Sequence, residues 1–406
     1  MSKKSPQLRF EGFTDDWEER KLKELGEIQT GNTPPTSDSD NYSLDGVPWV
    51  TPTDIKSLVI SNTAKKLSQV GVTKARIAKA GSILVTSIAS IGKNTLLRMD
   101  AGFNQQINSL TPTSENDSYF LLTQSEKWSE KMKQTAASAT MQIVNKTDFS
   151  NISTYVPVHK EEQEKIGLFF KQLDNTITLH QRKLDLLKEQ KKGFLQKMFP
   201  KNGAKVPELR FAGFADDWED RKLSSIAERV TRKNKNNEST LPLTISAQDG
   251  LVDQNDYFNK QVASRDVTGY FLVKNGEFAY NKSYSNGYPW GAIKRLDKYE
   301  MGVLSTLYIV FKPTAINSQF LVSYYETTRW YREVSKNAAE GARNHGLLNI
   351  SPNDFFNTLL TIPKSAEEQQ QIGSFFKQLD DTIALHQRKL DLLKEQKKGF
   401  IKQMFV

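Results

Sequence analysis

Two stretches of the chain carry the same pattern of apolar positions, spaced alternately four and three residues apart. In residues 161–199 the seam positions are Ile166, Phe170, Leu173, Ile177, His180, Leu184, Leu187, Lys191, Phe194 and Met198. In residues 367–405 they are Ile372, Phe376, Leu379, Ile383, His386, Leu390, Leu393, Lys397, Phe400 and Met404. This alternation is the seam of a coiled coil, and at about 1.5 Å per residue each seam spans roughly 48 Å. The pattern predicts two long helices that pack on each other.

The two predicted helices are copies of one sequence. Residues 179–194 recur unchanged as residues 385–400, and at a constant offset of 206 the stretches 161–199 and 367–405 are identical at 31 of 39 positions. Seam packing would preserve only the apolar positions. The outward-facing residues are repeated too, namely Gln181, Arg182, Lys188 and Glu189, with Gln387, Arg388, Lys394 and Glu395. Two identical outer surfaces predict docking of two copies of one partner; recent copying of the segment by recombination is the alternative, and it does not exclude docking.

The direction of the pair follows from its polar seam residues. A parallel pair in the repeat's own register would set Lys191 against Lys397 and His180 against His386, which would bury like charges. An antiparallel pair separates these residues and is expected to place apolar residues opposite each of them. We therefore predict an antiparallel pair with approximate two-fold symmetry.

A second, shorter repeat precedes each half. Residues 6–22 recur as residues 207–223 at an offset of 201. Phe10, Phe13 and Trp17 are echoed by Phe211, Phe214 and Trp218. The main interpretation is an aromatic anchor that fastens each domain to a helix end, and a partner-docking role is the alternative.

The repeats divide the chain into motif, domain and helix, twice. The predicted segments are a motif at 1–20, a first domain at 21–157, a first long helix at 158–200, a linker with the second motif at 201–221, a second domain at 222–363 and a second long helix at 364–406. Both domains mix strand and helix patterns, so the fold class is α+β.

The expected elements can be placed within each domain. In the first domain we expect strands at 47–50, 82–86 and 107–110 and a helix at 119–134. In the second we expect strands at 241–245, 277–280 and 304–311, a helix at 320–334, and a capping box from Ser365 and Glu368. The domain interiors align poorly with each other. Identical helices with divergent domains predict two different targets.

Composition narrows the function only slightly. The 406 residues carry a net charge of +9 with a pI near 9.2, which permits a polyanionic partner such as DNA. There is no cysteine, which excludes cysteine-based metal sites and fits a reducing compartment. Without an 18-residue apolar run or an apolar leader, the expected location is cytoplasmic.

No catalytic constellation emerges. The phosphate-binding loop G-x-x-x-x-G-K-[ST] is missing, and residues 32–36 (NTPPT) have an inserted Thr and no aromatic residue when set against the Asn-Pro-Pro-aromatic motif of adenine methyltransferases. His159, His180, His345 and His386 show no metal-ligand spacing. The sequence therefore predicts neither an active site nor a metal site.

Amide-rich and basic loops are the remaining polar feature. Asn, Gln and Arg can pair with base edges, and Lys, Ser and Thr can hold phosphates, although any single loop is explained by ordinary solvation. The DNA-binding candidates are Asn32, Thr33, Lys93, Asn94, Asn104, Gln105, Arg232, Lys233, Lys235, Asn281, Lys282, Tyr284, Arg343 and Asn344.

Taken together, the chain resembles the specificity subunit of a Type I restriction-modification enzyme over essentially its whole length. The resemblance rests on the repeated plan, the helices ending LDLLKEQKKGF, and the stretches 31–34, 47–49, 81–84 and 302–305. It also rests on the prolines at the helix entrances, Pro157 and Pro363.

The resemblance implies a non-catalytic, host-defence protein whose two recognition domains each read one half of a split site on double-stranded DNA. It implies that two modification (methyltransferase) subunits dock on the helices and that restriction subunits add translocation and cleavage. S-adenosylmethionine, ATP and magnesium would then belong to those partners, with no cofactor in this chain. The recognition domains vary within the family, so it assigns no base-contacting residue.

Two other hypotheses stay open at this point. A protein-only adaptor would use the duplicated helices to gather two proteins, and its binding to duplex DNA would be salt-insensitive or absent. A self-contained methyltransferase or nuclease would need catalytic motifs that the sequence lacks.

Overall fold

The computed structural model describes residues 4–137, 143–246, 248–283, 287–338 and 347–406. The chain forms two compact units. The first unit comprises residues 1–182 with residues 388–406, and the second comprises residues 183–387. Each unit therefore contains one recognition domain, part of one long helix and part of the other.

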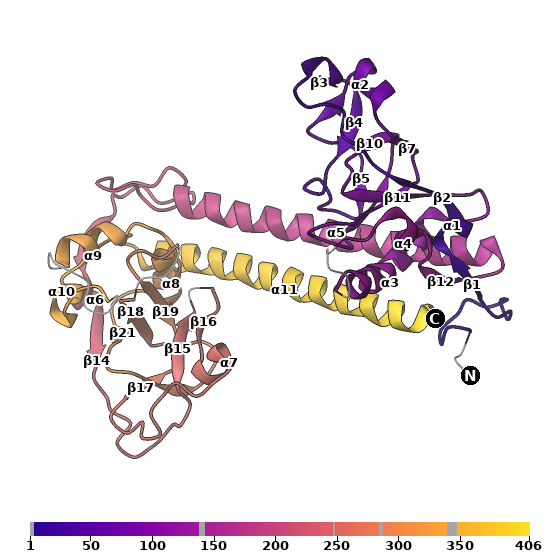
Figure 1. Ribbon diagram of the computed structural model, residues 1–406. Helices are drawn as coiled ribbons and strands as arrows, with labels where there is room; N and C mark the ends of the chain where they lie inside the picture. Colours follow the sequence, from indigo (N-terminus) through magenta and orange to yellow (C-terminus); the bar gives the residue numbers. More distant parts are fainter. Residues whose placement is uncertain (1–3, 138–142, 247, 284–286, 339–346) are drawn as a thin grey trace. The chain divides into compact units, whose positions relative to one another are not determined.

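The first unit contains a series of short strands and helices that begin with the motif and lead into a long helix (Figure 1). Its strands are β1 (Glu18–Lys21), β2 (Gly26–Thr30), β3 (Tyr42–Ser43), β4 (Val47–Val50), β5 (Val59–Ile60), β6 (Lys66–Leu67), β7 (Ile77–Ala78), β8 (Ile83–Thr86), β9 (Asn94–Leu97), β10 (Ala101–Phe103), β11 (Ile107–Pro112) and β12 (Ser153–Val156). Its helices are α1 (Leu22–Leu25), η1 (Ser39–Asn41), α2 (Gln69–Lys74), α3 (Ser118–Ala137), α4 (Lys146–Ser150) and the start of α5 (Lys160–Lys197).

The second unit repeats this plan with fewer short strands. Its strands are β13 (Glu219–Lys222), β14 (Ala227–Val230), β15 (Leu243–Ser246), β16 (Gly250–Asp253), β17 (Phe271–Lys274), β18 (Phe278–Asn281), β19 (Ala292–Arg295), β20 (Met301–Leu304), β21 (Ile309–Pro313) and β22 (Leu359–Ile362). Its helices are α6 (Leu223–Ile226), α7 (Gln254–Phe258), α8 (Ser318–Glu326), α9 (Tyr331–Asn337), α10 (Pro352–Phe356) and the start of α11 (Ala366–Met404).

The two recognition domains share a central sheet that their sequences do not reveal. The first has strand order β2-β11-β8-β9-β5, and the second has β14-β21-β18-β19. The first four strands of each sheet are antiparallel neighbours in the same order along the chain. The mixture of helices and antiparallel sheet confirms the predicted α+β class.

Three local predictions need correction. The expected strand at 304–311 is two strands, β20 and β21, which pair with different partners on either side of a turn. The expected helix at 320–334 is broken, because extended Thr327 closes α8 by donating its hydroxyl and its N–H to the carbonyl of Tyr324. The capping box is half formed: Ser365 Oγ accepts the N–H of Glu368, but the Glu368 side chain bonds elsewhere.

The long helices run antiparallel in both units, as predicted. In the first unit Phe169 near the start of α5 packs against Phe400 near the end of α11, with ring centroids 5.0 Å apart. In the second unit Phe194 near the end of α5 packs against Phe375 near the start of α11, also at 5.0 Å. The two pairs are the same repeat positions with the helices exchanged, which is the contact pattern of an internal two-fold repeat.

The partners of the seam lysines differ from the expectation. Lys191 does not face an apolar residue; its amine contacts the carboxylates of Asp380 in α11 and, at 2.7 Å, Glu326 in α8. Lys397 lies 2.8 Å from Asp174 and 3.6 Å from Glu126. The reason is electrostatic, because a half-buried ammonium needs a counter-charge that an apolar neighbour does not supply.

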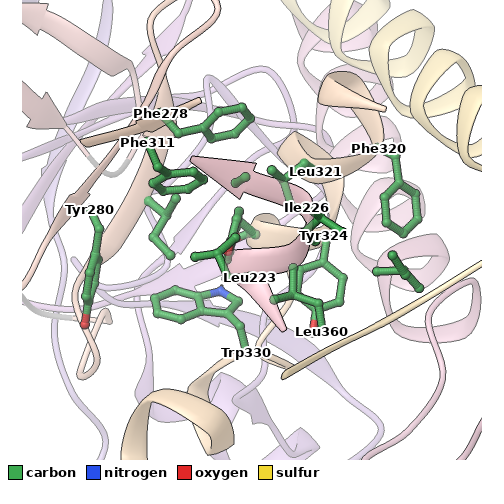
Figure 2. Close-up of a cluster of buried hydrophobic side chains, with 14 of the residues drawn as sticks. Leu223, Ile226, Phe278, Tyr280, Phe311, Phe320, Leu321, Tyr324, Trp330 and Leu360 are labelled. Carbon is green, nitrogen blue, oxygen red and sulfur yellow. Dashed lines mark hydrogen bonds between the residues drawn. The ribbon is translucent and has the colours of Figure 1, made fainter. Parts of the chain in front are cut away.

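Each unit has a core that joins its domain to both long helices. In the second unit Phe320 of α8 packs with Phe199 and Phe376 from the helices. Figure 2 shows the part of this core built by the sheet residues Phe278 and Phe311 with side chains of the surrounding helices. In the first unit the repeat counterparts Phe405 and Phe170 pack around Phe120 and Trp17. The domains are thus built onto the helix ends.

The short motif lies at this junction. Arg9 donates two hydrogen bonds to the fully buried carboxylate of Glu162, at 2.6 and 2.8 Å, and Arg210 does the same to Glu368 at 2.7 and 2.8 Å. Both ion pairs raise the pKa of the arginine. Phe10 packs on Phe169, and Trp17 and Trp218 are buried. These contacts support the anchor interpretation of the motif.

Candidate nucleic-acid interface

The connection after the third sheet strand is equivalent in the two domains. Residues 87–93 join β8 to β9, and residues 282–291 join β18 to β19. We call these segments the reading loops. Each reading loop makes an isolated antiparallel bridge to the segment that precedes the domain's last short helix, Ile88 to Ile143 before α4 in the first domain and Ser283 to Leu347 before α10 in the second. Several sequence-predicted candidates fall on or beside these loops.

In the first domain, three predicted stretches converge. The Asn104 amide donates to Thr33 Oγ1 at 3.2 Å, and the Thr33 hydroxyl donates to the Gln105 side-chain carbonyl. The carbonyl of Gln106 accepts both the backbone N–H of Ser87, at 2.8 Å, and its hydroxyl, at 3.0 Å. The turn at 104–106 therefore connects Thr33 to the reading loop, and Gln105 is the exposed amide of this group.

Asn32 has a positioning role within this cluster. Its amide donates to the carbonyl of Lys74 at 2.7 Å, and its oxygen accepts the N–H of Arg76 at 2.7 Å. Both ends of the side chain are thus bonded to backbone, which leaves little capacity for a base. The preceding residue must be glycine, because a Cβ at Gly31 would lie 2.2 Å from the carbonyl oxygen of Phe103.

The first reading loop presents an exposed lysine on a strained backbone. Lys93 is exposed, and its backbone N–H is bonded to Thr86 Oγ1 at 3.0 Å. Ala89 has φ of 61°, in the left-handed region that side chains rarely adopt. Lys133 of α3 lines the same cavity of about 420 Å³ as Ala89 and Lys93. Asn94 is half-buried at the start of β9.

Sequence reasoning missed Ala89 and Lys133. A backbone angle leaves no mark in a sequence, and Lys133 belongs to a helix pattern that gave no reason to associate it with a loop forty residues earlier. Strained positions of this kind persist where the surrounding structure holds them, often at binding sites.

In the second domain the predicted basic run divides into two kinds of residue. The Arg232 guanidinium bonds both carboxylate oxygens of buried Glu277, at 3.0 and 2.9 Å, and the carbonyl of Leu272. Lys233 donates to the Gly269 carbonyl and lies 4.2 Å from the centre of the Phe271 ring. Lys235 is exposed, and within the described part of the chain its amine has no ion-pair partner. Only Lys235 of these three is free for a phosphate.

Asn281 ends β18, and Lys282 begins the second reading loop. Asn281 Oδ1 accepts the N–H of Ser283 at 3.0 Å, and the half-buried Lys282 amine donates to the carbonyl of Ile350 at 3.3 Å. Burial lowers the pKa of Lys282. Tyr284, Arg343 and Asn344 lie outside the described residues. Among the residues that are described, no hydrogen bond or ion pair links Asn281 or Lys282 to the run 232–235.

The predicted docking residues lie on the surfaces of the long helices. Arg182, Lys188 and Glu189 are exposed on α5, and so are their copies Arg388, Lys394 and Glu395 on α11, whereas Gln181 and Gln387 are half-buried. The seam residues Ile166, Phe170, Leu184, Leu187, Ile372, Phe376 and Leu390 are buried. Leu173, Ile177, His180, Phe194, Leu379, Ile383, His386, Leu393 and Phe400 are half-buried.

Sequence reasoning also missed four exposed leucines at repeated positions of these helices. Leu179 and Leu186 of α5 are 64% and 51% exposed, and their copies Leu385 and Leu392 of α11 are 65% and 56% exposed. Leu186 lies five residues before Lys191 and Leu385 five residues after Asp380, so the two leucines are level with each other in the second unit. Leu179 and Leu392 have the same relation to Asp174 and Lys397 in the first unit.

These leucines face away from the domains. Leu195 packs against the core of the second unit and lies nine residues after Leu186. At about 100° per residue, nine residues place the two side chains on roughly opposite sides of the helix. Ile401 and Leu392 repeat this relation in the first unit. These exposed apolar side chains at repeated positions, away from the chain's own domain, are a candidate surface for contact with another protein.

Two other kinds of feature are absent from the described ranges. No group of three or more His, Cys, Asp or Glu side chains in them is arranged to hold a metal ion. No helix in the same ranges is long and apolar enough to cross a membrane.

Comparison with known proteins gives a consistent family. The family model of the Type I restriction modification DNA specificity domain matches residues 14–189 and again residues 215–395. The Type I restriction enzyme MjaIX specificity subunit of Methanocaldococcus jannaschii is 26% identical over 181 residues, which are 43% of this chain and 41% of that protein. The HindI specificity subunit of Haemophilus influenzae is 31% identical over 171 residues, 40% of this chain and 37% of that protein. Each alignment thus spans about two fifths of the curated relative.

Solved structures share the fold over nearly the whole chain. A Type-I restriction-modification system S subunit from M. genitalium superposes with a TM-score of 0.63 at 14% identity, covering 99% of both chains. A chain from a structural study of complex assembly and conformational transition of the type I R-M system gives a TM-score of 0.52 at 14% identity, covering 97% of this chain and 98% of the other.

Proposed function

Because the chain belongs to the family of Type I restriction-modification DNA specificity proteins, we propose that it is the DNA-reading subunit of such a system. Each recognition domain reads one half of a split site on double-stranded DNA. Two modification subunits dock on the long helices, and restriction subunits join that complex. S-adenosylmethionine, ATP and magnesium are bound by those partners. This chain contributes sequence recognition without catalysis.

The observation that carries the proposal is one scaffold with two different sets of side chains. Both domains have the same order of four antiparallel strands and the same bridged reading loop. The side chains on and beside the two loops differ: the first carries Ser90 and Lys93, with Asn94 at the start of β9, and the second carries Lys282 and Ser283, with Asn281 at the end of β18. Because side chains at a fixed backbone position determine which base edges are bonded, two such domains read two different half-sites.

The docking proposal rests on surfaces that are repeated. Leu186 with Leu385, and Leu179 with Leu392, give each unit a pair of exposed leucines, flanked by the repeated charged residues Arg182, Glu189, Arg388 and Glu395. Lys188 and Lys394 follow Leu186 and Leu392 by two residues, which places them about 200° away around the helix and outside this surface. Apolar side chains inside a polar rim are the usual composition of a protein interface. Equal surfaces in the two units fit two copies of one modification subunit.

Two glycines extend this surface. Gly193 and Gly399 follow Leu186 and Leu392 by seven residues, and an added Cβ would meet nothing within 4 Å at either. A glycine inside a helix costs about 1 kcal/mol relative to alanine, and nothing in the chain's own packing requires it here. Close approach of a partner's backbone is the role we assign to these glycines.

The test is methylation mapping by long-read sequencing in a host that carries the cognate modification subunit with and without this chain. The expected result is a split, adenine-methylated motif that is present only with the chain. If no motif depends on the chain, the DNA-reading proposal fails and a protein-only adaptor replaces it. Methylation or cleavage by the purified chain alone would instead indicate a self-contained enzyme.

A domain exchange sharpens this test. In a variant whose residues 222–363 are replaced by residues 21–157, both domains would read the same half-site. Because the helix contacts of one unit recur in the other with the helices exchanged, the motif should become an inverted repeat of the first half-site. An unchanged motif would show that the second domain does not read DNA.

A further inference from the structure

A cavity of about 630 Å³ lies in the second unit, between the end of α5, the second reading loop and the turn that joins α8 to α9. Its charged lining consists of Lys188, Lys191, Lys192, Lys294, Arg329 and Glu326. Five cations and one carboxylate give the cavity a strongly positive character. An anion is therefore the kind of ligand that it would attract.

Two of the cations are committed to the chain itself. Lys191 is held by Glu326 at 2.7 Å and by Asp380. Arg329 donates to the carbonyl of Gln196 at 3.0 Å, near the end of α5, where carbonyls lack partners within the helix. Neither group is free to bind a ligand strongly.

Three lysines remain for a ligand. Lys192 lies 3.8 Å from Glu189 on the exposed helix surface, which is a weak contact. The amines of Lys188 and Lys294 have no hydrogen-bond or ion-pair partner among the residues that the structure describes. Lys294 is half-buried in β19, and burial lowers its pKa. The charges of Glu326, Asp380 and Asp249 offset this burial only in part, and a bound anion would supply further counter-charge.

One residue of the cavity lining has an unsatisfied hydroxyl. Tyr325 is among the lining residues and is 7% exposed, and its hydroxyl has no hydrogen-bond partner in the described structure. Buried hydroxyls are normally bonded. An acceptor oxygen of a ligand would satisfy it.

The second reading loop forms part of the cavity wall. Tyr288 and Gly291 of this loop line the cavity. The end of the loop is held there, because Tyr280 Oη donates to the carbonyl of Trp290 at 2.8 Å and Gly291 has φ of 81°, where a Cβ would lie 2.0 Å from the carbonyl oxygen of Asn281. A ligand in the cavity would touch the loop that we assign to DNA reading, which favours nucleic acid over an acidic protein.

We propose that this cavity binds a backbone phosphate of the DNA beside the half-site read by the second domain, with Lys188, Lys192 and Lys294 as its cations. The inference rests on the proposed function and adds a contact that positions the duplex without reading sequence. A neighbouring cavity of about 440 Å³ also contains Lys294 but carries Asp249, Asp380 and Asp381. The charge of that lining is negative, opposite to that of the first cavity, so the phosphate would bind in the first cavity alone.

The experiment measures duplex binding by the complex with its modification subunits, using fluorescence anisotropy over a range of salt concentrations. One duplex carries the methylated motif found by mapping, and a second is unrelated in sequence. Lys188→Gln and Lys294→Gln should each weaken binding to both duplexes by the same factor. Loss of one phosphate contact should reduce the slope of log affinity against log salt by about 0.9.

The matched control is Lys394→Gln, the same helix position in the other repeat copy. It removes an equal charge from an identical local sequence, but Lys394 does not line this cavity. Binding by this variant should equal that of the wild-type complex. An equal loss in Lys394→Gln and Lys188→Gln would show a general effect of helix charge and overturn the inference. Lys188 is exposed, so its replacement tests the site even if Lys294→Gln folds poorly.

Further outcomes distinguish failure of the proposed function from failure of the cavity inference. If the wild-type complex shows no salt-dependent duplex binding, the proposed function fails. If it binds and methylates its motif while Lys188→Gln and Lys294→Gln keep the wild-type salt slope, only the cavity inference fails. Saturable binding of adenosine monophosphate that requires both lysines, with an unchanged duplex slope, would identify a free-nucleotide site and also overturn the inference.

Discussion

The ammonium group of Lys397 lies 2.8 Å from the carboxylate of Asp174, and the same two repeat positions meet again, with helices exchanged, as Lys191 and Asp380. A third residue, from the recognition domain, completes each group: Glu126 at 3.6 Å from Lys397 and Glu326 at 2.7 Å from Lys191. Each lysine therefore joins the two helices to one another and to a domain. Two carboxylates share one ammonium, so each group carries a net negative charge.

We predict that Lys191→Met destabilises the protein. It leaves Asp380 and Glu326 without their cation, and removing one partner of a buried ion pair costs about 3 to 5 kcal/mol. Because these side chains keep some exposure, we expect a loss of about 1 to 3 kcal/mol in the free energy of unfolding. Urea denaturation measures this change. Lys192→Met, one residue away and exposed, should change the same quantity by less than about 0.5 kcal/mol.

The pH dependence of that loss follows from the pKa values. Burial opposes the charge of Lys191, but Glu326 and Asp380 outweigh it and raise its pKa above the ordinary 10.5. This stabilisation is therefore full below pH 10.5 and lost as pH rises through the higher folded value. Burial and the charge of Glu326 raise the pKa of Asp380, so the carboxylate protonates at a higher pH than usual. The difference between wild type and Lys191→Met should shrink at both extremes; a constant difference would contradict the assignment.

Arg210→Met should strongly destabilise the protein, although Arg210 is not in a recognition loop. Arg210 is the bidentate partner of Glu368, which is 1% exposed and also accepts from Trp218 Nε1 at 3.2 Å. An unpaired carboxylate in this core should lower the free energy of unfolding by about 3 to 5 kcal/mol. Thermal and urea unfolding of the full chain measure it. The exposed pair of Arg221 and Glu219 provides the control, since Arg221→Met should cost less than about 1 kcal/mol.

Arg232 and Lys235 should separate structural from DNA-binding effects. Arg232→Ala leaves buried Glu277 unpaired, so stability should fall by about 2 to 4 kcal/mol. Lys235→Ala should leave stability within about 0.5 kcal/mol and weaken binding to all duplexes, with a salt slope lower by about 1. Anisotropy and urea titrations of both variants test this. A destabilised Lys235→Ala, or one with wild-type affinity, would remove Lys235 from the interface.

The paired change Leu186→Lys with Leu385→Lys should abolish docking of a modification subunit on the second unit. Both side chains are exposed, so the isolated chain should keep its stability within about 0.5 kcal/mol per site. Loss of a central apolar contact in an interface costs about 2 kcal/mol or more. Analytical ultracentrifugation should show one bound modification subunit in place of two. Leu307→Lys, at an equally exposed leucine of the second domain, should leave two bound.

The sequence by itself determined the long helices, their seams and their direction. Heptad spacing and the exact repeat gave Ile166, Phe170 and their copies as buried positions, and the like charges at Lys191 and Lys397 excluded a parallel pair. These features are periodic and local, so they can be counted along the chain. The strand at Val47–Val50 was found with correct bounds for the same reason.

Only the tertiary structure decided what the polar residues do. The sequence predicted Asn32 and Arg232 as DNA contacts. In the structure the Asn32 side chain is bonded to the backbone of Lys74 and Arg76, and the Arg232 side chain is bonded to Glu277. Lys191 read as a residue that needed an apolar neighbour, and it has two acids. The exposed leucines could not be told from seam residues by hydrophobicity. The physical reason is that the residue type does not show whether a side chain contacts the protein or the solvent. Contacts between residues distant in sequence, such as Glu326 with Lys191, form only when the chain folds.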